Sequence, residues 1–157
     1  MKLGAPHHVS IAVSDLEASL AFYRDGLGLR AVAEFSFDDE GHQVYLGLPE
    51  GASGRAVALR TDKPPAAGIT LCETDPEQPR PEPLESLAPG TVMLAFELEL
   101  PEEVDSLYEA LAAAGYSALS PPGWAEVKGF GQIRGVAVRD PDGLLIELYA
   151  PEPTADA

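Results

Sequence analysis

The sequence predicts an α+β fold built from two copies of a β-α-β-β-β module. The first observation is an internal repeat, because similar apolar runs begin at His8 and at Met93. The second is that a helical pattern follows each run, and that each half then ends in a similar strand-like segment, residues 68–72 and 145–149. Two halves with the same order of elements indicate a duplicated unit.

Each half contains one helix with recognisable ends. In the first half, Ser14 and Glu17 have the spacing of a capping box, and an apolar stripe continues to residue 27 before glycines stop the helix. In the second half the helix begins at Pro101, which suits a first helical turn, and ends at Gly115.

The strands after each helix follow from short apolar segments. Asp140-Pro141-Asp142-Gly143 is a tight-turn sequence that joins the last two strands as a hairpin. Residues 120–131 have loop composition and carry Trp124 and Phe130, which we expect to form a lid or a stacking wall over a ligand. The predicted strands are 31–37, 44–48 and 69–72 in the first half and 116–119, 133–139 and 144–150 in the second.

Domain boundaries follow the same division. We expect a first module over residues 1–75, a proline-rich linker over 76–90, a second module over 91–151 and a tail over 152–157. The 157 residues suit one structural domain that contains both modules.

Composition excludes several classes of function. A net charge of −16 disfavours nucleic acid and anionic membranes as partners, and no apolar stretch is long enough for a membrane span or a signal peptide. The single cysteine, Cys72, excludes a framework of intrachain disulfides and fits the reducing cytoplasm. A small molecule is therefore the expected partner. The unpaired sheet edges and the surface of each module that faces a cavity predict a homodimer.

These features resemble the vicinal oxygen chelate superfamily, which includes glyoxalase I, extradiol dioxygenases and bleomycin-resistance proteins. The resemblance rests on three segments, His8 to Glu17, Phe22 to Leu29 and Asp140 to Leu148. It implies that each module forms a curved mixed sheet and that the two sheets surround a shared cavity.

The resemblance also implies where a metal ion would bind. In members with a metal, the ligands come from the first and last strands of each module, which here are His8, Thr70, Met93 and Glu147. The usual minimum is two histidines and one glutamate, whereas this chain has one of each. Met93 is a soft thioether that suits the apolar lining of a cavity better than a Zn, Fe, Mn or Ni site, and Thr70 is a poor ligand.

Several further side chains are candidates for the site. Period-two alternation places Tyr149 on the same strand face as Glu147, and Glu97 on the face of Met93, so Glu147, Glu97 and Tyr149 are the candidate proton-transfer residues. Thr70, Cys72, Met93, Trp124 and Phe130 are the candidate substrate-binding residues. His42 is expected in a solvated loop, and His7 at the surface.

Three functions remain open from the sequence. The first is a lyase, isomerase or dioxygenase that holds a divalent metal with His8 and Glu147. The second is a metal-free protein that binds and sequesters a small molecule such as an antibiotic. The third is a metal-free cyclase or isomerase in which His8 and Glu147 form an acid–base pair.

Overall fold

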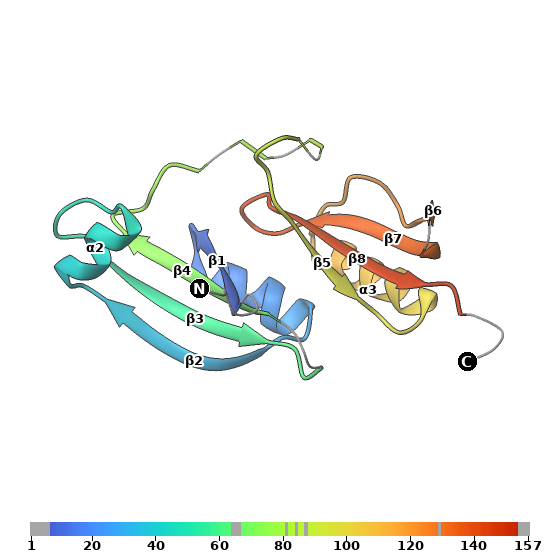
Figure 1. Cartoon of the computed structure of the whole chain (residues 1–157), viewed down its shortest axis with the longest axis horizontal. Helices are drawn as coiled ribbons and strands as arrows, with labels where there is room; N and C mark the ends of the chain where they lie inside the picture. Colours follow the sequence, from blue (N-terminus) through green and yellow to red (C-terminus); the bar gives the residue numbers. More distant parts are fainter. Residues whose placement is uncertain are drawn as a thin grey trace, which may run out of the picture. The chain divides into compact units, whose positions relative to one another are not determined.

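The computed structural model describes residues 7–63, 67–80, 82–83, 85–86, 88–128 and 130–153. The chain divides into two compact units, Met1–Pro81 and Glu82–Ala157. Each unit contains one four-stranded mixed sheet, which confirms the predicted α+β class and the two β-α-β-β-β modules (Figure 1). Residues 154–157 of the predicted tail lie outside the described residues.

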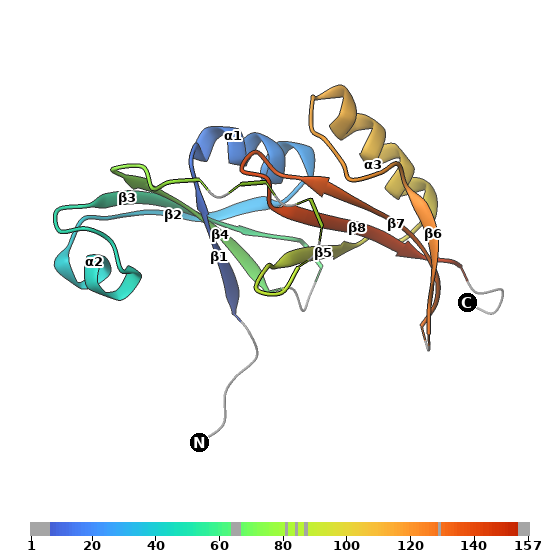
Figure 2. The same ribbon diagram turned by 90° about the horizontal axis from the view of Figure 1, so that it is seen from above.

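Unit 1 has the strand order β1-β4-β3-β2. Strand β1 pairs in parallel with β4, and β4 pairs antiparallel with β3, which pairs antiparallel with β2. Helix α1 lies against one side of this sheet and α2 lies on the other (Figure 2). The elements are β1 (His8–Val13), α1 (Leu16–Leu20), the π-helix η1 (Ala21–Gly26), β2 (Arg30–Phe37), α2 (Glu40–Leu46), β3 (Ser53–Arg60) and β4 (Gly68–Asp75).

Unit 2 repeats this topology with the order β5-β8-β7-β6. Its parallel pair is β5 with β8, and β7 pairs antiparallel with both β8 and β6. The elements are β5 (Met93–Glu97), α3 (Pro101–Ala113), β6 (Gly123–Val127), β7 (Gly131–Arg139) and β8 (Leu145–Pro151).

The first helix occupies the predicted segment but begins differently. Asp15, not Ser14, is the N-cap, and its side chain accepts a hydrogen bond from the backbone N–H of Ala18 at 2.9 Å. The predicted capping box is therefore wrong, since Glu17 pairs instead with Arg55 at 3.2 Å. The apolar stripe is confirmed, because its first members are almost fully buried in unit 1.

The predicted strand over residues 44–48 is wrong, because helix α2 covers most of it. The Asp39 carboxylate caps that helix by accepting from the His42 N–H, and Gly47 ends it with a left-handed φ of 67°. His42 thus lies in a capped helix and not in a solvated loop. Strand β3, one of the two inner strands of unit 1, forms in a segment where the sequence predicted no strand.

Unit 2 differs from the prediction in one strand. Residues 116–119 form only an isolated bridge, between Ala118 and Val138. The strand at this edge is β6, inside the segment predicted as a loop. The Asp140 turn is confirmed: its carboxylate accepts from the N–H groups of Asp142 (3.0 Å) and Leu144 (2.8 Å), and Gly143 has a φ of 88°.

Candidate functional site

The sheet of unit 2 has one face against α3 and one open face. Arg134 of β7 identifies the α3 face, because its guanidinium contacts the Asp105 carboxylate of α3 at 2.6 Å. Val136 and Val138 follow Arg134 at every second position of β7, so they lie on the same face as Arg134, where they are buried. The intervening positions of all four strands therefore form the opposite side, which we call the open face of unit 2.

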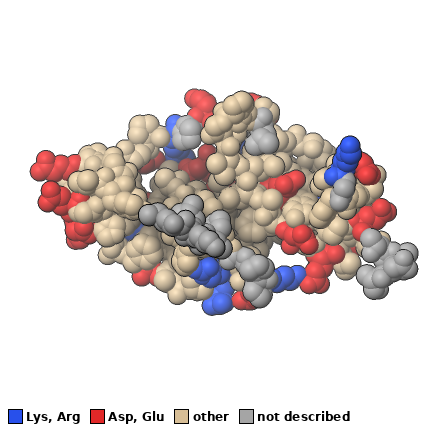
Figure 3. Space-filling model, in the orientation of Figure 1, with Lys and Arg blue, Asp and Glu red and all other residues tan. Residues whose placement is uncertain are grey.

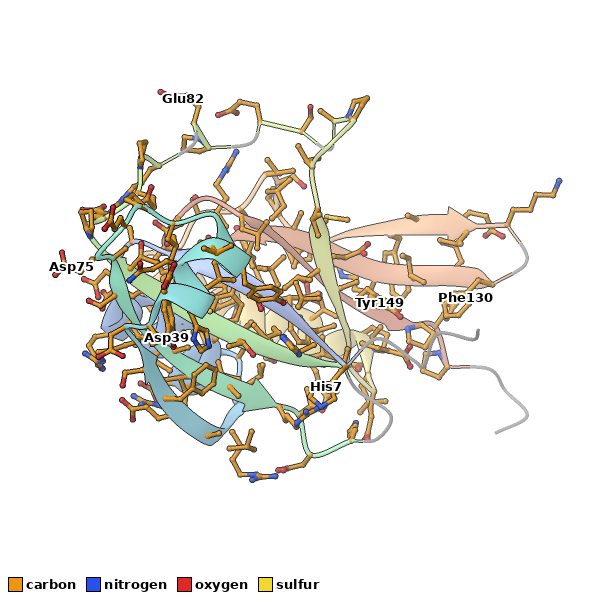
Figure 4. The ribbon with its side chains drawn as sticks, turned by 60° about the vertical axis from the view of Figure 1, so that its left-hand side comes forward. His7, Asp39, Asp75, Glu82, Phe130 and Tyr149 are labelled. Atoms are coloured by element: carbon orange, nitrogen blue, oxygen red, sulfur yellow. The ribbon has the colours of Figure 1, made fainter. Side chains whose placement is uncertain are left out.

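Glu147 and Tyr149 lie on this open face. The register pairs Ala95 with Glu147 and Glu97 with Tyr149 across the parallel strands, so the four side chains share one side of the sheet. A pocket of about 300 Å³ opens here, and Figure 4 shows Phe130 near Tyr149. The residues that line it are Ala95, Val127, Phe130, Ile133, Glu147 and Tyr149.

The phenol of Tyr149 is held by a second carboxylate. Its hydroxyl donates a hydrogen bond to Oε2 of Glu97 at 2.9 Å. Partial burial, this hydrogen bond and the negative charges of Glu97 and Glu147 all raise the pKa of Tyr149 above its ordinary value. Tyr149 therefore stays protonated at neutral pH and keeps its proton directed at Glu97.

Glu147 is half-buried, and it differs from Glu97 in having no protein partner among the described residues. No hydrogen bond or ion pair to its carboxylate exists in this part of the chain. A carboxylate among apolar walls is costly to leave without a partner. Its charge is thus available to a ligand or to a transferable proton.

In unit 1, the side of the sheet opposite α1 carries the corresponding residues of the first half. The register pairs His8 with Gly68, Ser10 with Thr70 and Ala12 with Cys72. The side chain of His8 is exposed and its Nδ1 lies 3.0 Å from Nδ1 of His7, whereas Thr70 is buried. Partial burial raises the pKa of the Cys72 thiol, so it is not an activated nucleophile.

Sequence comparison supplies the family. The profile of the glyoxalase/bleomycin resistance protein/dioxygenase superfamily matches residues 5–148. The chain belongs to this superfamily. A comparison with curated proteins gave no match.

Solved structures of the glyoxalase superfamily share the fold. A glyoxalase family protein from Bacillus cereus is 22% identical, with a TM-score of 0.73 over 96% of this chain and 95% of that one. A glyoxalase/dioxygenase from Nostoc punctiforme is 24% identical, with a TM-score of 0.65 over 98% of each chain. A domain from a Frankia species, described as glyoxylase/bleomycin resistance protein/dioxygenase, is 26% identical, with a TM-score of 0.62 over 96% of this chain and 94% of that one.

The four strand positions that hold a metal in some superfamily members are a poor set of ligands here. The two registers make Met93 the counterpart of His8, and Thr70 the counterpart of Glu147, as the repeat predicted. At these four positions each unit therefore has one good ligand for a divalent ion, because a thioether and a hydroxyl bind such ions weakly. Within the described ranges, no three His, Cys, Asp or Glu side chains gather as a metal site would need.

Trp124 has a different environment from the other predicted binding residues. It lies in β6 opposite Arg134, and the Arg134 guanidinium is 5.8 Å from the centre of its ring. It is therefore on the α3 face of the sheet, whereas Glu147 is on the open face. The glycines around Trp124 suggested a mobile loop, but alternation within β6 would have identified the face.

The apolar walls of the pocket were not predicted from the sequence. Ala95 precedes Glu97 by two positions and shares its face, so its place could have been inferred from alternation. Val127 and Ile133 reach the pocket through the pairing of β6 with β7, and the sequence did not reveal that pairing.

Unit 1 has a pocket of its own that the sequence did not predict. It has a volume of about 520 Å³ and lies where β4 ends and β3 begins. Serines and acidic side chains line most of it, and Arg55 is its one cation among the described residues. Figure 3 shows that acidic side chains are also prominent elsewhere on the displayed surface.

Proposed function

We propose that this glyoxalase-superfamily chain is a metal-free enzyme that moves a proton within a small oxygenated substrate, with Glu147 as the general base. The observation that carries the proposal is the carboxylate of Glu147, which has no partner among the described residues and lies in an apolar pocket. A substrate bound beside this carboxylate would displace water from it and place its own proton within reach of the base.

The proposed reaction begins when the Glu147 carboxylate removes a proton from carbon next to a carbonyl group. The substrate becomes an enolate and Glu147 becomes a neutral carboxylic acid. In an α-hydroxycarbonyl substrate, return of this proton to the former carbonyl carbon, together with transfer of the hydroxyl proton from one oxygen to the other, completes an isomerisation that consumes no oxidant or reductant. An isomerase or lyase is therefore favoured over a dioxygenase, since ring cleavage needs a metal centre that these residues are poorly suited to hold.

Glu97 and Tyr149 position the reacting groups. Because Tyr149 donates to Glu97, its ring is fixed beside Glu147 and forms one wall of the pocket. Glu97 would act on the substrate only through this phenol. His8, the acid partner predicted from the sequence, belongs to unit 1, and its pairing with Glu147 stays a prediction.

A second candidate function is binding without turnover. Apolar side chains form most of the pocket walls. In addition, two of the four strand positions that hold a metal in some superfamily members carry weak ligands, the thioether of Met93 and the hydroxyl of Thr70. Both features suit a protein that sequesters an apolar compound. The two functions share a pocket and differ in whether Glu147 exchanges a proton with the ligand.

Hydrogen–deuterium exchange separates the two functions. The protein is incubated in heavy water with a panel of small aldehydes, hydroxyketones and aminoketones, and loss of their α-proton signals is followed by NMR. Exchange that is lost in Glu147→Gln and kept in Glu126→Gln supports the enzyme. Glu126 is the matched control because it lies in β6 on the α3 face and pairs with Gln132. Binding of panel compounds in the pocket without exchange of any of them would favour sequestration.

The metal alternative has its own measurement. Protein purified without an affinity tag is analysed for Zn, Fe, Mn and Ni, and exchange is compared before and after treatment with a chelator. Stoichiometric metal that His8→Ala or Glu147→Gln removes would refute the metal-free proposal and restore the metal-dependent reaction predicted from the sequence.

We also propose that the chain forms a homodimer in the cytoplasm. In the described parts of the chain no helix is long and apolar enough to cross a membrane.

Support for the dimer comes from helix α2, where the side chains of Val44 and Tyr45 are 76% and 82% exposed. Light scattering at micromolar concentration tests it, and a monomer mass would count against it.

A further inference from the structure

The pocket of unit 2 offers hydrogen-bond acceptors and no free donor among its described side chains. Glu147 is a carboxylate, and the one hydroxyl proton in the lining, that of Tyr149, is already donated to Glu97. What remains for a ligand is the oxygens of Glu147 and the lone pair of the Tyr149 hydroxyl. A ligand must therefore supply the donors.

The charges of the pocket have one sign. Glu97, across the strand pair, and Glu147, two residues before it in β8, are both neighbours of Tyr149 on this face, and the described lining contains no Lys or Arg. Arg139 is the cation of β7 on this face, and its guanidinium lies 3.5 Å from the carboxylate of Glu85. The pocket is thus an anionic concavity in a chain whose net charge is −16.

The other side chains that line the pocket are mostly apolar and include an aromatic ring. Phe130 is 56% exposed and Val127 is 39% exposed at the end of the β6–β7 hairpin. An aromatic face attracts an organic cation, and apolar walls retain its hydrocarbon part. A volume of about 300 Å³ is at the lower end for ligand sites and suits a molecule with a single ring.

We infer that the pocket selects small organic cations that carry N–H donors, such as a primary ammonium or an amidinium attached to one aromatic or aliphatic ring. The inference rests on the proposed function, because it names the substrate class for the site at Glu147. The ammonium group would lie between Glu147 and the Tyr149 hydroxyl, and the ring would lie against Phe130. An anionic compound of the same size would be excluded by the two carboxylates.

Three probes of nearly equal shape test this inference. Benzylammonium, benzyl alcohol and benzoate are titrated into the full chain, and Kd is measured by NMR chemical-shift changes. We expect benzylammonium to bind about tenfold more tightly than benzyl alcohol, and benzoate not to bind. The benzylammonium affinity should fall as NaCl is raised from roughly 20 to roughly 500 mM, because salt screens the ion pair.

Variants assign the selectivity to the pocket. Glu147→Gln should weaken benzylammonium binding about tenfold and leave benzyl alcohol unchanged, whereas Glu126→Gln should affect neither probe. Glu97→Gln gives a second, independent loss of charge with a smaller effect, because that carboxylate already accepts from Tyr149. The circular dichroism spectrum of each variant confirms that it is folded.

The outcomes also separate this inference from the proposed function. Equal binding of the three probes, or selectivity that survives Glu147→Gln, would overturn the cation inference. If the cation inference fails but proton exchange depends on Glu147, the assignment of Glu147 as the general base still stands. Selective binding of benzylammonium without exchange of any panel compound would support the cation inference and refute the enzyme.

Discussion

Replacing Met93 by histidine tests the register on which the site assignments rest. Met93 pairs with Leu145, and Ala95 pairs with Glu147, so Met93 and Glu147 are diagonal neighbours on one face of a parallel strand pair. Diagonal Cβ atoms lie roughly 7–8 Å apart, and each metal–ligand bond takes up about 2 Å. Two such bonds leave roughly 4 Å of the separation between the Cβ atoms. An imidazole at residue 93 and the carboxylate of Glu147 can span this distance, so the two side chains can bind one ion.

We expect Met93→His to bind Zn²⁺ or Ni²⁺ roughly tenfold to a hundredfold more tightly than the unchanged chain. The gain is the added imidazole bond less the cost of orienting and dehydrating the ring. Isothermal titration is carried out on the unchanged chain, on Met93→His, and on Met93→His combined with Glu147→Gln. A gain that disappears in the double variant shows that the two positions converge on one ion.

An absence of any gain would refute the reasoning. The side chain at residue 93 would then not point to the side of Glu147, and the equivalence of Met93 with His8 would fall with it. A gain that persists without Glu147 would mean that the new imidazole binds the ion elsewhere on the surface.

Three further outcomes are expected. Gly54→Ala should lower the free energy of unfolding by about 2 kcal/mol or more, because the added Cβ would lie 2.6 Å from a backbone oxygen of β4. Gly123→Ala is the control, since a Cβ there meets open space, and urea unfolding of both variants measures the difference. Asp140→Ala should cost about 1–3 kcal/mol in the same measurement, since two turn N–H groups lose their acceptor. The absorbance of tyrosinate should show that Tyr149 titrates above its ordinary pKa of about 10, and Glu97→Gln should lower that pKa. Because the folded-state pKa is raised, this phenol contributes stability below about pH 10 that is lost as the pH rises through the raised value.

The parts of the fold that the sequence predicted correctly depend on local rules. The helix that begins near Pro101 and the turn at Asp140 are specified by neighbouring residues, through capping and through backbone preference. Alternation along β8 likewise placed Glu147 and Tyr149 on one face without knowledge of the rest of the sheet.

The errors arose where one local signal outweighed another. The apolar run at Val44 favoured a strand, but the cap at Asp39 and the left-handed Gly47 specify a helix, and the apolar side chains stay exposed. In residues 120–131 glycine and proline indicated a loop, and the strand β6 forms there because β7 provides a partner along its whole length. The position of Phe130 beside Glu147 depends on that pairing, so only the tertiary structure shows it.

The exposed apolar side of helix α2 has a consequence for how the protein behaves in concentrated solution. Two of its side chains, Val44 and Tyr45, are more than three-quarters exposed, and in a protein of low net charge they would favour aggregation. The strong negative charge keeps molecules apart and so provides colloidal protection. That protection vanishes near the isoelectric point of about 4.3, and it weakens in concentrated salt. Acidic buffers and salting-out steps are therefore where the protein will precipitate first. Polar residues at positions 44 and 45 would reduce this precipitation, and they would also remove the apolar surface that supports the proposed homodimer.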